Sequence, residues 1–208
     1  SPEVGEVKPT SGHPIDLQGG KMQEDLKDYK GAFRPNISFN DFSKGTLTDL
    51  IKLYSRLFLV LDAYWYLAVK ESANNDKALE CDLSVWDKFA AYELPRLCSV
   101  LKIEKEGISG LFKAFQFMGL CWFNNMEYDM KLVSENHGIL TVTHCPTLLA
   151  IEKEGSGRKK GICQVVESFI FKKYAEYFDP KIEVEALKIP PRENRGKGEI
   201  CCQWQFKV

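Results

Sequence analysis

Long apolar runs and an excess of one charge are both missing from this sequence of 208 residues. The most apolar stretch, residues 57–69, is interrupted by Asp62 and is shorter than the roughly 20 residues that cross a bilayer, so we expect no membrane span. The formal net charge is −1, which argues against a nucleic-acid partner because phosphate binding needs a basic face. The expected partner is a small-molecule ligand or substrate.

Cysteine is absent before Cys81, and the total of seven is odd. Both facts argue against the disulfide framework of a small secreted protein. The N-terminal residues are polar and proline-rich and lack the apolar segment of a secretory signal. We therefore expect reduced thiols and a cytoplasmic location.

Residues 1–45 are rich in proline and glycine and have no sustained hydrophobic period, which predicts an extended N-terminal arm. Such an arm is seldom ordered alone, so we expect it to contact the body of the protein or to form a homo-oligomer through a partner subunit. Residues 46–208 are expected to form a single α+β domain, with a helical half (46–124) and a sheet-containing half (125–208).

The helical half shows apolar residues at helical spacing. The helices expected there cover residues 46–72, 83–101 and 106–123. Pro95 lies inside the second helix and should kink or split it.

From residue 126 onward the hydrophobic period changes from helical to alternating, which indicates strands. The elements expected there are a hairpin of strands 126–133 and 139–144, helices 146–154 and 161–178, and strands 181–189 and 199–207. The order β-β-α-β-β predicts a mainly antiparallel four-stranded sheet with a long helix on one face.

Three cysteines of the sheet-containing half are candidates for chemistry. Alternation along the last strand places Cys202 on the core-facing side and Cys201 on the other, exposed or peripheral side. Cys145 lies at a strand-to-helix corner, and Cys163 lies in the first turn of the long helix, where the helix dipole favours a thiolate.

Three readings of Cys145, Cys163 and Cys202 remain open: a metal site, a reactive thiol, or three inert buried thiols. Three thiols with one histidine or acid would suit zinc, although no Cys-x-x-Cys spacing is present. His144 has the opposite strand parity to Cys145 and reaches the same site only if the strand ends there.

The helical half offers a second candidate set. Asp62 lies among apolar residues, and a carboxylate there needs a partner. Glu93 and Arg96 are three residues apart on one helix, which is typical of an ordinary surface pair. The alternative is a pocket wall in which Trp86, Glu93 and Arg96 orient a small polar ligand.

Scattered residues give the chain a resemblance to the L-2-amino-thiazoline-4-carboxylic acid hydrolases and their uncharacterised prokaryotic relatives. They are residues 61–66, 78–82, 85–86 and 93 in the helical half, and 144–146, 161–163 and 202–206 in the sheet-containing half. Those enzymes open a small ring containing sulfur and nitrogen by hydrolysis, so the resemblance implies a hydrolase acting on a small cyclic substrate of the amide or amidine type.

With such an activity, Cys163 would be the thiolate, with Cys145 or His144 beside it. Asp62 and Glu93 would act as general acid–base or positioning groups. The substrate-binding side chains would then be Trp65, Tyr66, Trp86 and Arg96.

The C-terminal half also resembles the 4-vinyl-reductase type of small-molecule-binding domain, in which cysteines and acids bind zinc beside a ligand pocket. Cys145, Cys163 and Cys202 occupy comparable places. This resemblance implies the alternative function, a non-enzymatic binding or sensing module with zinc as its metal.

Overall fold

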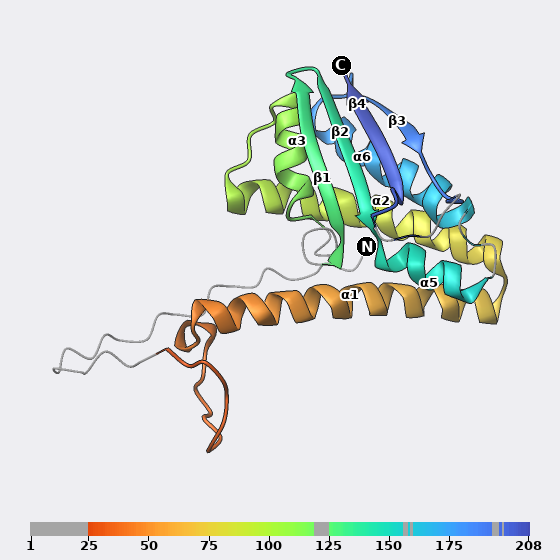
Figure 1. Cartoon of the computed structure of the whole chain (residues 1–208). Helices are drawn as coiled ribbons and strands as arrows, with labels where there is room; N and C mark the ends of the chain where they lie inside the picture. Colours follow the sequence, from red (N-terminus) through yellow and green to blue (C-terminus); the bar gives the residue numbers. More distant parts are fainter. Residues whose placement is uncertain (1–24, 119–124, 156–157, 159, 193–195, 197) are drawn as a thin grey trace. The chain divides into compact units, whose positions relative to one another are not determined.

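The chain divides into two units, Ser1–Thr48 and Asp49–Val208. The computed structural model describes residues 25–118, 125–155, 158, 160–192, 196 and 198–208 (Figure 1). Of the arm expected over residues 1–45, residues 1–24 lie outside this description.

The described part of the first unit is held by hydrogen bonds of both backbone and side chains. Leu26 and Phe42 form an isolated parallel bridge, and a short 3-10 helix, η1 (Phe39–Asp41), precedes Phe42. The backbone N–H of Ser38 donates to Asp41 Oδ2 at 2.6 Å and so caps η1. This unit ends within the first turns of α1 (Lys44–Ser72).

Two further helices of the helical half differ from their expected bounds. α2 (Asn75–Leu101) begins eight residues earlier than expected, because Asn74 accepts a hydrogen bond from the Lys77 backbone N–H at 2.8 Å and caps it. Pro95 does not split α2: both it and the residue four positions earlier, Ala91, are exposed, so water can reach the freed carbonyl group. α3 (Gly107–Phe115) ends before residues 119–123, the last part of the expected helix, which lie outside the described residues.

The sheet has four antiparallel strands in the order β1-β2-β4-β3. The strands are β1 (Glu127–Ser134), β2 (His137–His144), β3 (Glu183–Lys188) and β4 (Cys202–Lys207). The expected hairpin and the two C-terminal strands are confirmed, and with them the α+β fold.

The second strand runs directly into α5 (Pro146–Glu154), whose N-terminus is capped by the Cys145 sulfur. The helix expected over residues 161–178 has two parts: η2 (Lys160–Val166), which is π-helical, and α6 (Glu167–Phe178). π-Helical turns occur often at functional sites.

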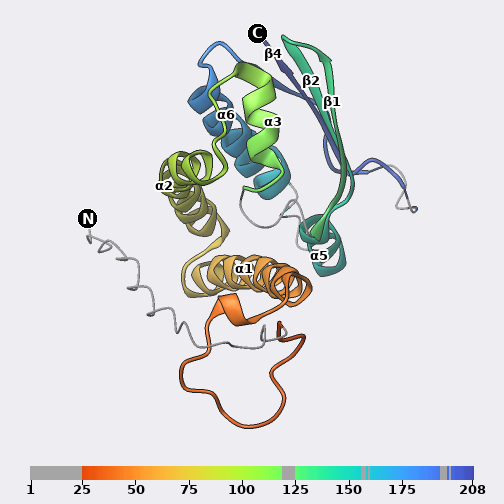
Figure 2. The same cartoon turned by 90° about the vertical axis from the view of Figure 1, so that its left-hand side faces the viewer.

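Aromatic rings fill the space between the sheet and its helices. α3 and α6 cover one face of the sheet, and α2 lies beyond them (Figure 2). The Phe171 and Trp204 rings lie 4.9 Å apart between centroids, and those of Phe115 and Phe206 lie 5.5 Å apart. Gly138 on β2 allows α3 to approach, because a Cβ there would lie 2.6 Å from the ring of Phe112. No helix in the described ranges is both long and apolar enough to cross a membrane.

Candidate functional site

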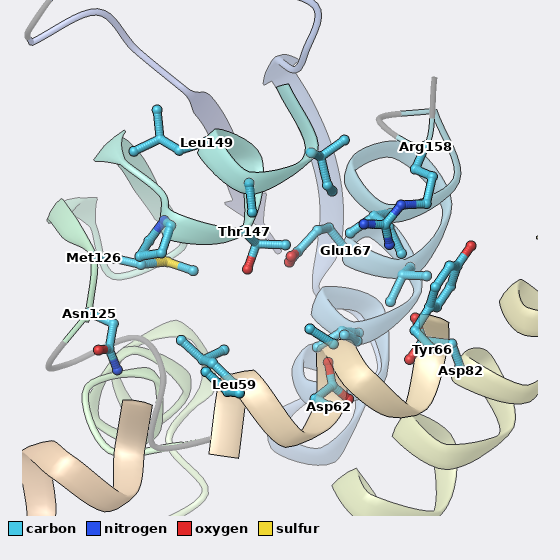
Figure 3. A pocket seen from close by; sticks show the side chains of 18 of the residues that line it. Leu59, Asp62, Tyr66, Asp82, Asn125, Met126, Thr147, Leu149, Arg158 and Glu167 are labelled. Atoms are coloured by element: carbon cyan, nitrogen blue, oxygen red, sulfur yellow. The ribbon is translucent and has the colours of Figure 1, made fainter. Parts of the chain in front are cut away.

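A cavity of about 620 Å³ lies in the second unit (Figure 3). Its walls come from α1, α2, α5, η2 and α6, together with residues before β1 and at the end of β2. Leu59, Trp86 and Ile162 contribute apolar surface. A chamber of this size with apolar walls and a few polar groups is typical of small-molecule sites. We call it the acidic cavity, for the three carboxyl groups that line it.

These carboxyl groups belong to Asp62 on α1, Asp82 on α2 and Glu167 on α6. Burial raises the pKa of Asp62 to about 6. Burial also raises the pKa of Asp82 to about 7, with repulsion by Asp62 adding to the effect. The pKa of Glu167 is raised to about 7 by burial and by the charges of Asp82 and Asp62. All three therefore change protonation near neutral pH.

Arg158 brings a positive charge to the same cavity. Its guanidinium pairs with Glu154 and lies 5.1 Å from the centre of the Tyr66 ring. It lowers the pKa of Asp82, as does a hydrogen bond from the Trp86 side chain, but burial has the larger effect. The Arg158 side chain extends toward the carboxyl groups in Figure 3.

A second, much smaller cavity of about 20 Å³ adjoins the first. Four cysteines line it: Cys145, Cys163, Cys201 and Cys202. We call it the thiol cavity. Glu167 and Met126 line both cavities, so one carboxyl group lies between the two.

The thiols of this cavity are poorly suited to ionise. Burial raises the pKa of Cys145 and of Cys163 to about 12, with the charge of Glu167 adding to each shift. Burial also raises the pKa of Cys202 well above its usual value. The lowered pKa expected for Cys163 at a helix N-terminus is thus reversed. Loss of water outweighs the helix dipole at this position.

Cys201 requires a correction, because it is 2% exposed and not peripheral. The regular strand begins only at Cys202, so strand alternation does not apply to the residue before it. The Cys201 N–H donates to the Val142 carbonyl at 2.7 Å, and Arg192 donates to the Cys201 sulfur at 3.7 Å.

The metal reading gains no support from this geometry. Among the described residues, which include Cys145, Cys163 and Cys202, no three His, Cys, Asp or Glu side chains are arranged to hold a metal ion. The strand does end at His144, as its role required, but His144 lines the acidic cavity and Cys145 the thiol cavity.

The residues expected on the helices separate into two groups. Asp62, Tyr66 and Trp86 line the acidic cavity. Three others are not among the described residues that line either cavity: Glu93, Arg96 and Trp65.

Each of those three has a different environment. Glu93 accepts a hydrogen bond from the Tyr174 hydroxyl at 2.6 Å, which joins α2 to α6. The Arg96 guanidinium lies 3.5 Å from the centre of the Tyr92 ring on its own helix. Trp65 is 67% exposed.

A family model matches residues 40–208 of the chain, and its description is "Family of unknown function (DUF6125)". The chain belongs to this family. Neither the search of curated proteins nor the search of solved structures found a match. The DUF6125 match spans α1 to β4 and so includes every residue that lines the two cavities.

Sequence reasoning missed four charged residues that line the acidic cavity of this DUF6125 chain: Arg56, Asp82, Arg158 and Glu167. For Glu167 a signal existed, because it lies on the apolar stripe of its helix, between Cys163 and Ile170. A carboxylate on a core-facing stripe needs a reason, as Asp62 did. Asp82 directly precedes the helix expected over residues 83–101, and Arg158 lies between the helices expected over 146–154 and 161–178, so neither residue was a candidate.

Proposed function

We propose that this protein is an enzyme of the hydrolase type that acts on a small organic substrate held in the acidic cavity. Carboxyl groups, not cysteine thiolates, transfer the protons. One observation carries the proposal: Asp62, Asp82 and Glu167 line a single cavity, and each has a pKa raised toward neutrality. General acid–base groups work best when their pKa lies near the working pH.

The charge of the cavity favours a substrate with a positively charged nitrogen. Three carboxyl groups line the cavity with two guanidinium groups, those of Arg56 and Arg158, and Arg158 is already paired with Glu154. A cation in the cavity is attracted by whichever of these carboxyl groups is ionised. The aromatic rings of Tyr66 and Trp86 line the same cavity and suit a flat cationic group. An amidine fits these conditions, and it agrees with the substrate class that the sequence resemblance implies.

Asp82 and Glu167 have the properties that a hydrolytic proton transfer needs. With a pKa of about 7 each, one can be ionised while the other remains protonated. The ionised carboxylate takes a proton from water as it attacks the substrate carbon. The protonated carboxyl group gives a proton to the leaving atom. Two carboxyl groups in these two states supply both halves of the reaction.

Turnover of 2-amino-2-thiazoline tests the proposal. Water adds to the ring carbon between nitrogen and sulfur, and the C–S bond breaks. The sulfur leaves with the electron pair and takes one proton, the ring nitrogen of the C=N bond takes the other, and the water oxygen becomes a urea carbonyl. Ellman's reagent measures the new thiol against a blank without substrate. We expect thiol release that is proportional to enzyme; no release above the blank would contradict hydrolysis of this ring.

A second candidate, a binding or sensing module, is favoured by the aromatic walls, because rings beside carboxylates bind organic cations without chemistry. Benzamidine and its neutral analogue benzamide, compared by calorimetry, measure binding alone. The cationic site predicts tighter binding of benzamidine, strengthening as pH rises through about 7 and the carboxyl groups ionise. Binding of benzamidine together with no turnover would favour the module over the enzyme.

A further inference from the structure

Helix α1 carries apolar residues on two opposite faces. From Asp49 onward one face belongs to the body of the second unit. Leu59, Asp62 and Tyr66 line the acidic cavity, and Ser55 is fully buried and accepts a hydrogen bond from the Asn125 side chain at 2.6 Å. These residues recur every three or four positions, which is one side of a helix.

The opposite face is apolar and exposed. Six of its large apolar side chains are between 47% and 67% exposed: Leu53, Tyr54, Leu57, Leu61, Tyr64 and Trp65. Tyr54, Leu57, Leu61 and Tyr64 follow one another at intervals of three, four and three residues, the spacing of a helix–helix seam. At 100° per residue, Leu61 lies nearly opposite Leu59. The apolar residues whose helical spacing predicted α1 are thus mainly residues that no other described part of the second unit covers.

The area of this face is large for a solvent-exposed surface. A fully exposed large side chain presents roughly 200 Å², so six that are somewhat more than half exposed present on the order of 700 Å² per copy. Apolar patches on ordinary monomers seldom exceed about 300–600 Å². About 800 Å² from each partner is, however, the size of a standard stable interface.

We propose that this face binds the same face of a second copy, so that two α1 helices pack antiparallel about a twofold axis and form a homodimer. An axis near residue 59 places Leu57 opposite Leu61 of the second copy and Tyr54 opposite Tyr64. Each pair is repeated by the symmetry, so the apolar set is complementary to itself. Between residues 53 and 65 the charged side chains are Arg56 and Asp62, and both line the acidic cavity on the other side of α1, so the pairing brings no like charges together.

A membrane surface fits this helix less well than a second copy. A helix that lies in a bilayer interface has a strongly polar face rich in Lys and Arg behind its apolar face. Behind the apolar face of α1 lie instead Leu59, Asp62 and Tyr66, which line the acidic cavity. The dimer would also hold one wall of that cavity in place. The inference does not depend on the reaction proposed above.

Sedimentation equilibrium of the full chain tests this inference. We expect a mass of 47.6 kDa, twice the 23.8 kDa of one chain, at micromolar concentration. The double variant Leu57→Glu/Leu61→Glu should sediment as a monomer of 23.8 kDa. Val100→Glu is the matched control, because Val100 is a 77% exposed apolar residue on α2, and it should remain dimeric. A wild-type monomer, or a dimer that persists in the double variant, would overturn the proposal.

A second variant covers the case in which the glutamates prevent folding. Leu57→Cys/Leu61→Cys places thiols opposite each other across the proposed axis, so mild oxidation should link two chains, whereas the parent chain and Val100→Cys should not link. Absence of this cross-link contradicts the antiparallel pairing. Deletion of residues 1–43 decides between interfaces: the α1 dimer survives it. A dimer that is lost on deletion would mean that the N-terminal segment forms the dimer interface. A dimer that appears only after deletion would mean that this segment covers the α1 face in the full chain. Either result would overturn the proposal.

Discussion

The acidic cavity and the thiol cavity are neighbours that share Glu167, yet burial has opposite chemical consequences in them. In the acidic cavity, burial raises the pKa of Asp82 and Glu167 to about 7, where they exchange protons readily at neutral pH. In the thiol cavity, it raises the pKa of Cys145 and Cys163 to about 12, where they remain neutral. The same loss of water brings carboxyl groups into the working range and removes thiols from it.

The volumes of the two cavities support the same division. The acidic cavity holds about 620 Å³, enough for a small organic molecule, whereas the thiol cavity holds about 20 Å³, about the space of one water molecule. We therefore propose that chemistry on a substrate takes place in the acidic cavity and that the residues of the thiol cavity serve packing. The predictions below test that division.

The largest effect is expected from Asp82→Asn, which keeps the shape of the side chain but removes its proton transfer. Turnover of the cyclic amidine should fall about 10²–10⁴-fold, the usual contribution of a general acid or base. Glu80→Gln is the matched control, since Glu80 is exposed on the same helix and pairs with Lys77. Steady-state kinetics measure both variants. If Asp82→Asn were as active as the control, the proposed proton transfer by carboxyl groups would be contradicted.

The thiol side predicts slow alkylation. A pKa of about 12 for Cys145 and Cys163, against an ordinary value near 9, lowers the thiolate fraction about 1,000-fold. Iodoacetamide at neutral pH should therefore label these thiols at least about 100-fold more slowly in the native protein than in the unfolded chain. Peptide mass spectrometry over time measures each site. If Cys163 were labelled as fast as in the unfolded chain, a thiolate mechanism would return.

Periodicity was sufficient for most of the fold but not for the site. The alternation after residue 126 predicted the strands, because the side-chain period of a half-buried strand is visible in the sequence. The start of α2 was missed because the cap at Asn74 depends on a single hydrogen bond, at 2.8 Å to the Lys77 N–H. The acidic cavity forms because α1, α2 and α6 pack around it. A local sequence pattern does not predict which helices pack together.

Asp62 shows how far such reasoning extends. A lone carboxylate in an apolar helix was enough to mark Asp62 as a candidate, and it lines the cavity. Glu167 carried the same signal but lay within a helix selected for its cysteine. The pKa of Cys163 was assigned the wrong direction, because the sequence shows a helix N-terminus but not the burial that outweighs it.

The shared carboxyl group makes the stability of the protein depend on pH. The folded-state pKa of Glu167 is about 7, against 4.5 for an ordinary glutamate. Between these two values the folded state holds a proton that the unfolded chain has lost, so the free energy of unfolding falls as pH rises from about 4.5 to 7 and then levels off. Glu167→Gln removes this loss.

Urea unfolding of Glu167→Gln and the wild type at pH 5 and pH 8 measures the effect. The variant should be more stable than the wild type by about 2–3 kcal/mol at pH 8, and by much less at pH 5. Asp62 and Asp82 titrate in both proteins, so the difference isolates Glu167. If the variant and the wild type differed in their free energy of unfolding by the same amount at both pH values, Glu167 would not titrate near neutrality, and its role would be packing alone.

The smallest effect is expected on the thiol side, from Cys163→Ala. Cys163 is 9% exposed and belongs to the hydrophobic core, so removing its sulfur should cost about 1 kcal/mol of stability. Turnover should change less than about three-fold, because a thiol that remains protonated transfers nothing to the substrate. Cys163→Ser is the sharper variant: it nearly preserves volume but places a hydroxyl group in a cavity with little polar surface, so it should be no more stable than Cys163→Ala. If Cys163→Ala lost as much activity as Asp82→Asn while keeping its stability, the reaction would take place in the thiol cavity and not in the acidic cavity.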